Sequence, residues 1–581
     1  MSALPRRLQA RAVHATQMPA QLSPLLQRIY GARRVTHPGQ LATGLDALLP
    51  VSTLENVQEA AALLLSHARG RVLIVGDFDA DGATSTALMM HALTEWGFAG
   101  IDFLVPDRFR LGYGLTPGLV EQAAAREPTL IVTVDNGVSS VEGVAAARAL
   151  GIEVLITDHH LPGTQLPDAT VMVNPNACGG AFGSRALAGV GVAFYVLAAL
   201  YKLMQQQGLL PAGARPVAQW LDLVALGTVA DLVPLDANNR VLVAQGLRRM
   251  RSRQCTPGVA ALLQVAGREQ AGVTAADLGF AVGPRLNAAG RLDDMSVGIR
   301  CLLARDAAGA LELATQLDEL NRQRRLIEGD MQKQAEAAVK HLAAWVEGDR
   351  HAGLTLFDAG WHQGVVGLVA SRIKDRVGRP VIAFAPAGEA APGLGEELRG
   401  SARSIAGVHV RDVLESVSSQ HPGLILRFGG HAMAAGLTIR AADLDRFARA
   451  FDAAVSRQLA QVEPDDVIWT DGELDASQIS LATAEMLREA GPWGQAFPEP
   501  SFQGEFEVDS VRIVGEKHVK YWLRPAGSRA RFDAIAFNLL DGERFTVPPE
   551  GKLRVAYRLD INHWQGERRL QLVIEYVENP L

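Results

Sequence analysis

The sequence predicts an α/β protein with a parallel-sheet domain, a long spacer helix, a smaller α/β domain and a C-terminal β-barrel. Apolar runs at 72–75, 130–134 and 154–156 alternate with helical segments, as in a parallel sheet with crossover helices. Residues 306–345 contain no proline and repeat apolar side chains at helical spacing. From about residue 466 the chain changes to short runs of alternating polarity, which is typical of a small barrel.

The composition describes an ordinary soluble protein that is too large for one core. The 581 residues are 48% hydrophobic and 20% charged, and a chain of this length is expected to divide into three or four domains. Its three cysteines, Cys178, Cys255 and Cys301, are far apart, which argues against a zinc ribbon or a disulfide framework. No uncharged apolar stretch is long enough to span a membrane. We therefore expect a cytoplasmic protein.

The positions of Gly-, Pro- and polar-rich stretches and the changes of pattern along the chain suggest five segments. We expect an N-terminal extension at 1–50, the parallel-sheet domain at 51–240, a helical connector with the long spacer helix at 241–350, the second α/β domain at 351–462 and the barrel at 463–581. The sheet domain is predicted to open with an amphipathic helix over 51–70, capped by Ser52 or Thr53.

An acidic segment follows the first predicted strand. The segment 71–82, RVLIVGDFDADG, ends its apolar run at Gly76 and places Asp77, Asp79 and Asp81 at alternate positions. Three crowded carboxylates repel one another unless a cation lies among them. The alternative is an acidic turn, because Asp and Gly are common turn residues.

Two later strands favour the cation. The second run ends in Asp135-Asn136-Gly137 and the third in Asp158-His159-His160. Parallel neighbours bring their carboxyl ends to one edge of the sheet, so these acids and imidazoles can converge. Carboxylate oxygens with one or two imidazoles suit Mn²⁺ or Mg²⁺, and a pair of ions can share one bridging carboxylate.

These motifs resemble a known family. GDFDADG, VDNG, TDHH and Asp231 in GTVADLVPL are similar to the four motifs of the DHH phosphoesterases. GPRLNAAGR, WHQGVVGLVASR, RGSARS and FGGHAMAAG look like the RecJ branch, whose members are single-strand-specific 5′→3′ exonucleases. The resemblance extends from about Leu41 to the end of the chain. It implies two Mn²⁺ or Mg²⁺ ions between a DHH domain and a smaller DHH-associated domain, and an OB-fold that guides single-stranded DNA.

The expected catalytic roles follow from the motifs and the resemblance. The metal ligands are Asp77, Asp79, Asp81, Asp135, His159 and Asp231. Asp135 is the expected bridge, and spacing leaves open whether Asp77 binds directly or through water. Asp77, His160 and Asp158 form the expected catalytic group, in which His160 stabilises charge on the phosphorus or the leaving oxygen and Asp158 orients an imidazole.

Substrate contacts are expected in three places. Arg108, Arg110 and Tyr113 lie in a Gly-broken loop, where an aromatic ring and arginines can hold a nucleotide; the alternative is a surface loop whose tyrosine fills a gap. The resemblance places Arg285, Asn287 and Arg291 near the scissile backbone.

The third place is a phosphate pocket in the second domain. His362 and Gln363 precede a predicted helix, where backbone amides can face an anion. Gly429 and Gly430 precede His431 and a second predicted helix start, although such a Gly-Gly-His is more often a turn. Four further residues complete the predicted pocket: Ser371, Arg372, Ser401 and Arg403.

The formal net charge of −7 argues against a nucleic-acid partner, but the metal-binding acids contribute to it and the arginines cluster locally.

Our interpretation is an exodeoxyribonuclease that degrades single-stranded DNA to mononucleotides in DNA repair and recombination. We expect a monomer that works with a helicase and a single-strand-binding protein. Two alternatives are a DHH phosphoesterase for small substrates and a non-catalytic single-strand-binding scaffold. The first motif lacks the His and Asn-Pro of the former, and the filled motif positions disfavour the latter.

Overall fold

The computed structural model describes residues 7–578 with internal gaps. The gaps are residues 16, 20, 108–112, 164, 178, 347–351, 388–395, 406, 431, 460–466, 541–544, 546 and 565–566. Within the part of the chain that is described, no helix has the length and apolar character needed to cross a membrane.

A five-stranded parallel sheet forms the first lobe. Its strand order is β3-β2-β4-β5-β6, and every neighbouring pair is parallel. The strands are β2 (Arg71–Val75), β3 (Gly100–Leu104), β4 (Leu130–Val134), β5 (Glu153–Thr157) and β6 (Val171–Val173). The three predicted metal-bearing strands β2, β4 and β5 are adjacent, so their carboxyl ends meet at one edge.

Helices cover both faces of this sheet, because alternate residues of the strands are buried on opposite sides. Helices α2 (Val57–Ser66), α3 (Ala80–Glu95) and α6 (Gly189–Gln206) pack together against one face. Helices α4 (Pro117–Ala124) and α5 (Val141–Ala149) cover the other.

One predicted helix start was misplaced. Helix α2 begins at Val57 after Asn56, whereas Ser52 and Thr53 lie in the separate short turn η3 (Val51–Thr53). Helix α3 begins at Ala80, because the Asp79 side chain caps its first turn. Asp81 therefore lies in a helix rather than in a loop.

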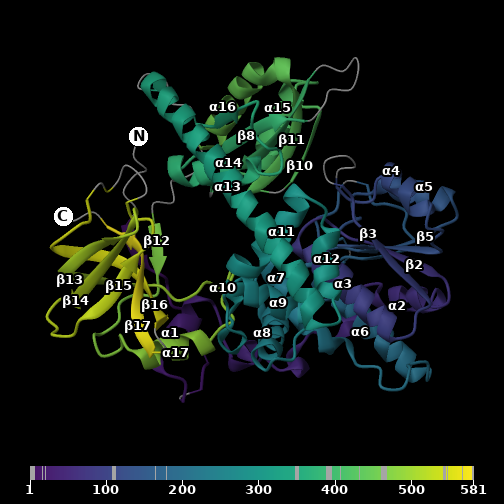
Figure 1. The fold of residues 1–581 in the computed structure, drawn as a ribbon, viewed down its shortest axis with the longest axis horizontal. Helices are drawn as coiled ribbons and strands as arrows, with labels where there is room; N and C mark the ends of the chain where they lie inside the picture. Colours follow the sequence, from purple (N-terminus) through teal and green to yellow (C-terminus); the bar gives the residue numbers. More distant parts are fainter. Residues whose placement is uncertain are drawn as a thin grey trace.

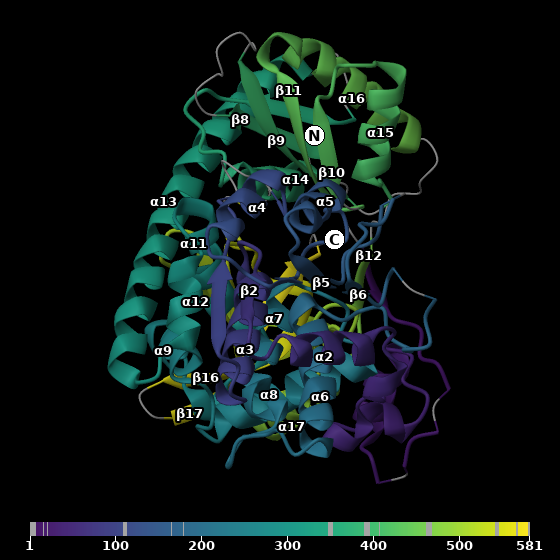
Figure 2. The same cartoon turned by 90° about the vertical axis from the view of Figure 1, so that its right-hand side faces the viewer.

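A helical connector follows the sheet and ends in the predicted spacer helix. Two helices, η4 (Val217–Trp220) and α7 (Leu221–Ala230), still belong to the predicted sheet domain. The connector then consists of α8 (Ala237–Arg251), α9 (Pro257–Val265), η5 (Gln270–Gly272), α10 (Ala275–Asp277), the π-helical turn η6 (Leu278–Val282), α11 (Gly283–Leu292), α12 (Ser296–Leu303) and α13 (Ala307–Val346). Helix α13 has 40 residues and is continuous through Gly329. At 1.5 Å per residue it is about 60 Å long, and it links the connector to the second lobe (Figure 2).

The second lobe is a five-stranded mixed sheet with the order β10-β11-β9-β8-β7. Its elements are β7 (Leu354–Phe357), α14 (Val366–Val377), β8 (Val381–Pro386), β9 (Glu397–Arg403), α15 (Val410–Gln420), β10 (Arg427–Gly430), β11 (Ala434–Arg440), η7 (Ala441–Asp443) and α16 (Leu444–Leu459). The prediction of a helix after the Gly-Gly pair was wrong, because Gly429 lies opposite Gly436 in the antiparallel pair β10–β11.

The C-terminal strands close into the predicted barrel, with the order β13-β14-β15-β17-β16. They are β13 (Phe502–Val514), β14 (His518–Pro525), β15 (Phe532–Ala536), β16 (Lys552–Trp564) and β17 (Glu567–Val577), and α17 (Leu481–Glu489) packs against β16 and β17. Strand β12 (Val467–Thr470) does not join the barrel; it pairs in parallel with the N-terminal strand β1 (Arg7–Ala10).

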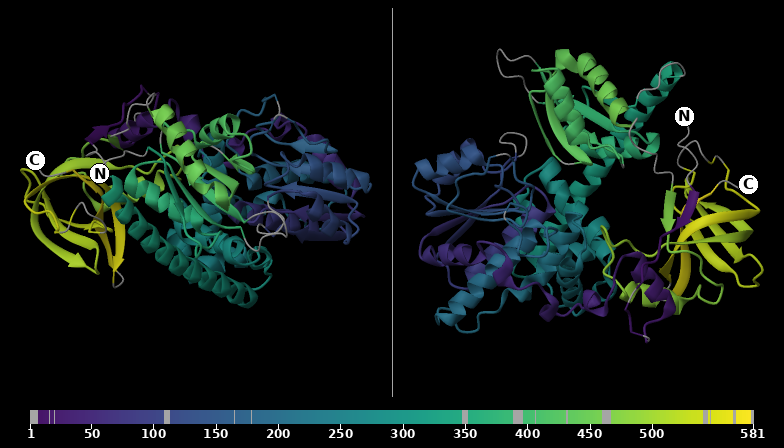
Figure 3. Two further views of the ribbon diagram at one scale, coloured as in Figure 1. Left: turned by 90° about the horizontal axis from the view of Figure 1, so that it is seen from above. Right: turned by 180° about the vertical axis from the view of Figure 1, so that it is seen from behind.

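The N-terminal segment completes the molecule with α1 (Pro24–Ala32), η1 (Pro38–Leu41) and η2 (Leu45–Ala47). In Figure 1 the parallel sheet and the barrel lie on opposite sides of the connector, and the second lobe lies above it. The view from behind shows the same arrangement (Figure 3, right). The predicted fold class is confirmed.

Candidate active site

Asp79 and Asp81 enter the site from the first turn of α3. Asp79 Oδ1 accepts hydrogen bonds from the N–H groups of Asp81 at 2.9 Å and Gly82 at 3.0 Å. The buried Asp81 carboxylate accepts hydrogen bonds from the N–H groups of Gly189 at 2.6 Å and Val190 at 3.0 Å, at the start of α6. Helix N-termini favour negative charge, so both acids are held in place by the fold.

Asp135 follows β4 and is constrained by its surroundings. Its φ of +62° lies in the left-handed region, which residues other than glycine rarely adopt. A Cβ on Gly189 would lie 2.5 Å from the Asp135 Cβ. Only glycine at that position allows α6 to approach so closely, and Asp135 is thus fixed between β4 and α6.

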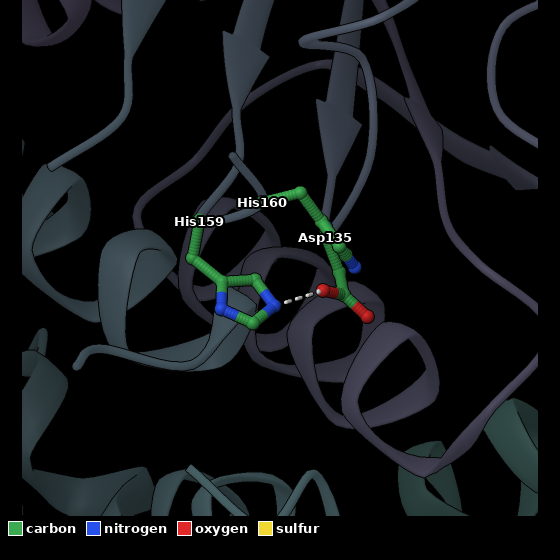
Figure 4. Close-up of side chains that lie close together, drawn as sticks. All are labelled: Asp135, His159 and His160. Carbon is green, nitrogen blue, oxygen red and sulfur yellow. Dashed lines mark ion pairs between the residues drawn. The ribbon is translucent and has the colours of Figure 1, made fainter. Parts of the chain in front are cut away.

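The His159 side chain lies between the carboxylates of Asp135 and Asp231. Its Nε2 lies 3.1 Å from Asp135 Oδ1 (Figure 4) and 3.5 Å from Asp231 Oδ2, where Asp231 ends α7. Three groups of side chains each have ligand atoms within 4.8 Å of one another: Asp77, Asp79 and Asp135; Asp81, His159 and Asp231; Asp135, His159 and His160. Asp135 and His159 each belong to two groups. All six predicted metal ligands therefore converge.

Burial and mutual repulsion make these carboxylates poor acids. Burial, followed by the charge of Asp79, raises the pKa of Asp81 to about 7. Burial, followed by the charges of Asp81 and Asp79, raises the pKa values of Asp135 and Asp231 well above their ordinary range. The cluster therefore needs a positive partner to be fully ionised at neutral pH.

Asp158 and His160 form a pair beside the cluster. Asp158 Oδ1 lies 2.8 Å from His160 Nδ1, and Asp158 Oδ2 accepts the N–H of Val138 at 2.8 Å. Burial opposes the charge on both groups, but their hydrogen bond lowers the pKa of Asp158 and raises that of His160 to about 9. His160 is therefore a cation at neutral pH, in the orientation set by Asp158.

Tyr113 lies over this pair. Its hydroxyl donates a hydrogen bond to the Asp135 carbonyl oxygen at 3.1 Å, and its ring contacts His160 edge-on with centroids 5.7 Å apart. The residue is 44% exposed, while its hydroxyl end faces the acid cluster. Tyr113 is thus placed between the cluster and solvent. Arg108 and Arg110 lie outside the described residues.

The second lobe gathers polar groups at the start of α14. Arg403 Nη1 donates to Ser401 Oγ at 2.8 Å, and a Cβ on Gly367 would lie 2.7 Å from Arg403 Nη2. Arg399 Nη1 donates to Gln363 Oε1 at 3.2 Å. Burial lowers the pKa of Arg403, so its charge lies in a partly dehydrated place where an anion is attracted strongly.

The remaining predicted contacts in this lobe are arranged differently. His362 Nδ1 accepts the N–H of Gly364 at 3.2 Å, just before α14. Ser371 is half-buried on α14, and Arg372 Nε donates to Glu328 Oε1 of α13 at 3.2 Å. Gly429 and Gly430 lie in β10, so their backbone is part of a sheet and not of a helix N-terminus. His431 lies outside the described residues.

The residues of α11 have internal partners. Asn287 Oδ1 accepts the N–H of Ala80 at 2.8 Å and so supports the first turn of α3. Arg285 is buried and donates to Asp318 Oδ1 at 2.9 Å and 2.8 Å. Arg291 Nη1 donates to the Gly364 carbonyl oxygen at 3.3 Å and thereby joins the two lobes. Their predicted substrate contacts stay predictions.

Comparison with known proteins decides the family. The chain matches the DHH family N-terminal domain at residues 71–228, the DHHA1 domain at 338–457 and the RecJ OB domain at 470–576. It is 50% identical to the single-stranded-DNA-specific exonuclease RecJ of Dickeya dadantii over 98% of this chain and 99% of that protein. The corresponding Escherichia coli protein is 48% identical over 98% and 99%.

The chain belongs to the RecJ family. A crystal structure of Thermus thermophilus RecJ in complex with Mn²⁺ matches 97% of this chain and 76% of that one, with a TM-score of 0.77 and 29% identity. The same RecJ in complex with Mg²⁺ has a TM-score of 0.71 and 27% identity. The predicted resemblance and fold are confirmed.

The cluster in this RecJ relative fits divalent cations. It consists of carboxylate oxygens and imidazole nitrogens, which suit Mn²⁺ and Mg²⁺. Its raised pKa values show the excess of negative charge that a cation would neutralise. A Cβ on Gly227 would lie 2.7 Å from Asp81 Oδ1, so the close packing behind the acids depends on glycine.

Sequence reasoning missed Arg399. The alternation that places Ser401 and Arg403 on one face of β9 also includes Arg399, and this signal was present in the sequence. No such sequence pattern marks Gly189 and Gly227, because the residues that they contact are distant in sequence.

Proposed function

We propose that this protein is a metal-dependent exonuclease that degrades single-stranded DNA 5′→3′ to mononucleotides by two-metal phosphodiester hydrolysis, in DNA repair and recombination. The observation that carries the proposal is the convergence of five aspartates and two histidines, from three parallel strands and two helices, at one edge of the sheet. The curated RecJ relatives are named single-stranded-DNA-specific exonucleases.

The cluster divides into two sets with shared members. Asp77 and Asp79 would hold one ion, Asp81, His159 and Asp231 the other, and Asp135 would bridge them. Bound divalent ions polarise the phosphodiester and lower the pKa of water. The hydrogen bonds from the N–H groups of Gly189 and Val190 hold the Asp81 carboxylate in one orientation, with or without a bound ion.

His160 supplies a fixed positive charge. Burial lowers the pKa of its imidazole, but the hydrogen bond to Asp158 raises it and so favours the protonated form, and the same 2.8 Å contact fixes the ring. A cation in this place stabilises the negative charge that develops on the phosphoryl oxygens or on the leaving oxygen.

The second lobe recognises the end of the strand. Arg403 and Ser401 at the start of α14 offer a charged fork, a hydroxyl and helix N-terminal amides, which together suit a terminal phosphate. Arg399 and Gln363 extend this surface. Binding of the 5′ phosphate here would place the first phosphodiester at the acid cluster and set the 5′→3′ direction.

The alternatives have less support. A small-substrate phosphoesterase would use the same acids but has no evident need for the barrel of β13–β17. A non-catalytic scaffold would not require seven converging ligand side chains.

A strand labelled at either end tests the proposal. The wild-type protein should release mononucleotide at once from a 5′ label, but not from a 3′ label, in Mn²⁺ and not in EDTA. Asp135→Ala should abolish cleavage while retention of the strand remains measurable. Hydrolysis of dinucleotides without degradation of the strand would contradict the proposal in favour of the first alternative.

Further parts of the proposal concern organisation. We propose domains at 51–240, 351–462 and 463–581, with 1–50 as an extension and 241–350 as the connector. We also propose a cytoplasmic monomer that acts with a helicase and a single-strand-binding protein, since the exonuclease needs unwound DNA.

A further inference from the structure

Phe280 is unusually exposed for an aromatic residue. It is 80% accessible, the highest value for any large hydrophobic side chain among the described residues. Its neighbours Leu278, Ala281 and Val282 are buried in the same turn. That turn, η6, is π-helical, and such turns are rare and concentrate at functional sites.

The segment that carries Phe280 touches two distant parts of the protein. Before it, the Gly272 carbonyl oxygen accepts a hydrogen bond from Arg488, which belongs to α17 beside the barrel. After it, Asn287 accepts the N–H of Ala80, next to the acids of α3. The segment that carries Phe280 therefore connects the barrel side with the first turn of α3.

Phe280 also lies near the acid cluster itself. Cβ atoms on Gly279 and Gly283 would lie 3.3 Å from Val229 and 3.2 Å from Ala230, which directly precede Asp231. Leu232, on the other side of Asp231, is 66% exposed and has a φ of +61°. Phe280 and Asn287 are separated by about 10 Å of helix axis at 1.5 Å per residue. The turn that carries the exposed ring thus packs against the end of α7 from which Asp231 enters the site.

We propose that Phe280 is a stacking platform for a base of the single strand as it approaches the acid cluster. This inference rests on the proposed exonuclease function and adds a residue that positions the substrate. An aromatic face stacks on any base, so the contact is tolerant of sequence. Base faces are accessible only in unpaired DNA, and the contact therefore favours single strands over duplex.

Base stacking on Phe280 is compatible with the negative net charge of this protein. With a formal net charge of −7, general electrostatic attraction for DNA is weak. A stacked base adds affinity without adding a phosphate contact. The contribution of Phe280 should consequently be independent of salt, unlike that of an arginine on the backbone.

The test uses the full chain and compares three variants. Phe280→Ala removes the ring, Phe280→Tyr retains a stacking face, and Leu209→Ala removes a 50% exposed side chain just beyond the C-terminal end of α6. Loss of one stacked base should raise KM for a long single strand about tenfold in the alanine variant. The slope of log KM against log salt should not change, and Phe280→Tyr and Leu209→Ala should both retain the wild-type KM.

A set of strands with one abasic position, moved stepwise from the 5′ end, gives the second readout. At one of these positions, the abasic site should raise the KM of the wild-type protein by about the same factor as the Phe280→Ala substitution does. The same strand should have no further effect on the KM of Phe280→Ala. Unchanged KM in Phe280→Ala, or an abasic effect that is equal in the two proteins, would overturn the inference. Unchanged KM would leave Phe280 as a docking residue for a protein partner. If the wild-type protein cleaves no single strand, the proposed function fails first.

Discussion

Removal of the divalent ions should make the stability of the protein fall as the pH rises through the weakly acidic range. The pKa of Asp81 is about 7 in the folded protein against an ordinary value of 3.8. Between these values the folded protein holds a proton that the unfolded chain has released, so a rise in pH favours unfolding. The difference of about three pKa units corresponds to about 4 kcal/mol in total. About 2 kcal/mol of this should be lost between pH 5 and pH 7.

The other acids of the cluster act in the same direction in this window, whereas burial lowers the pKa values of His91 and His362, so these two act in the opposite direction with or without ions. Asp135 and Asp231 also have raised pKa values and should add to the loss. The pKa of His160 is raised from 6.5 to about 9, so its stabilising contribution is complete below pH 6.5 and is lost progressively between pH 6.5 and pH 9, in the same direction as that of the acids. A bound cation lowers the pKa values of the carboxyls and should remove most of the slope.

The assay is urea unfolding at pH 5, 6 and 7, in EDTA and in Mn²⁺. The free energy of unfolding should fall with pH in EDTA and stay nearly level in Mn²⁺. Asp81→Asn should flatten the EDTA curve. Asp222→Asn is a matched control, because burial also raises the pKa of Asp222 but this acid is bonded to Thr256 and not to the cluster, so the substitution should change the EDTA and Mn²⁺ curves equally. An EDTA curve that falls no more steeply than the Mn²⁺ curve would refute the reasoning.

Three further predictions concern packing and recognition. Gly189→Ala should lower Mn²⁺ affinity at least tenfold by calorimetry, because its Cβ would lie 2.5 Å from that of Asp135, whereas Gly329→Ala has an open position and should bind normally. Arg33→Ala should lower the free energy of unfolding by about 3 kcal/mol in urea, since buried Asp471 loses its 2.7 Å partner and keeps Arg11 at 3.6 Å. Arg403→Met should reduce the kcat/KM preference for 5′-phosphorylated over 5′-hydroxyl strands at least tenfold, as expected for one charged hydrogen bond; an unchanged ratio would place the end-binding site elsewhere.

The elements with strong periodicity were predictable from the sequence. The apolar runs of β2, β4 and β5, the long helix α13 and the alternating strands of the barrel all occur near their predicted positions. The convergence of the acids was also predictable, because parallel neighbouring strands present their carboxyl ends at one edge. The hairpin β10–β11 was not, since its glycines and alanines have neither the period of a helix nor that of a strand.

Tertiary structure decided how individual side chains are used. Arg285 and Arg403 both lie within motif-like segments. The Arg285 guanidinium is paired with Asp318, whereas the Arg403 guanidinium lies against the start of α14. Such differences depend on residues that are distant in sequence. Local pattern carries no information about them.

The sequence by itself determined the class of fold, the acids and histidines at the sheet edge, and the family resemblance, because these depend on residue type and short-range spacing. Only the tertiary structure decided the shared positions of Asp135 and His159, the glycine contacts behind Asp81 and the exposure of Phe280. Each of these depends on how closely separate helices approach one another, and that distance is set by packing across the whole molecule.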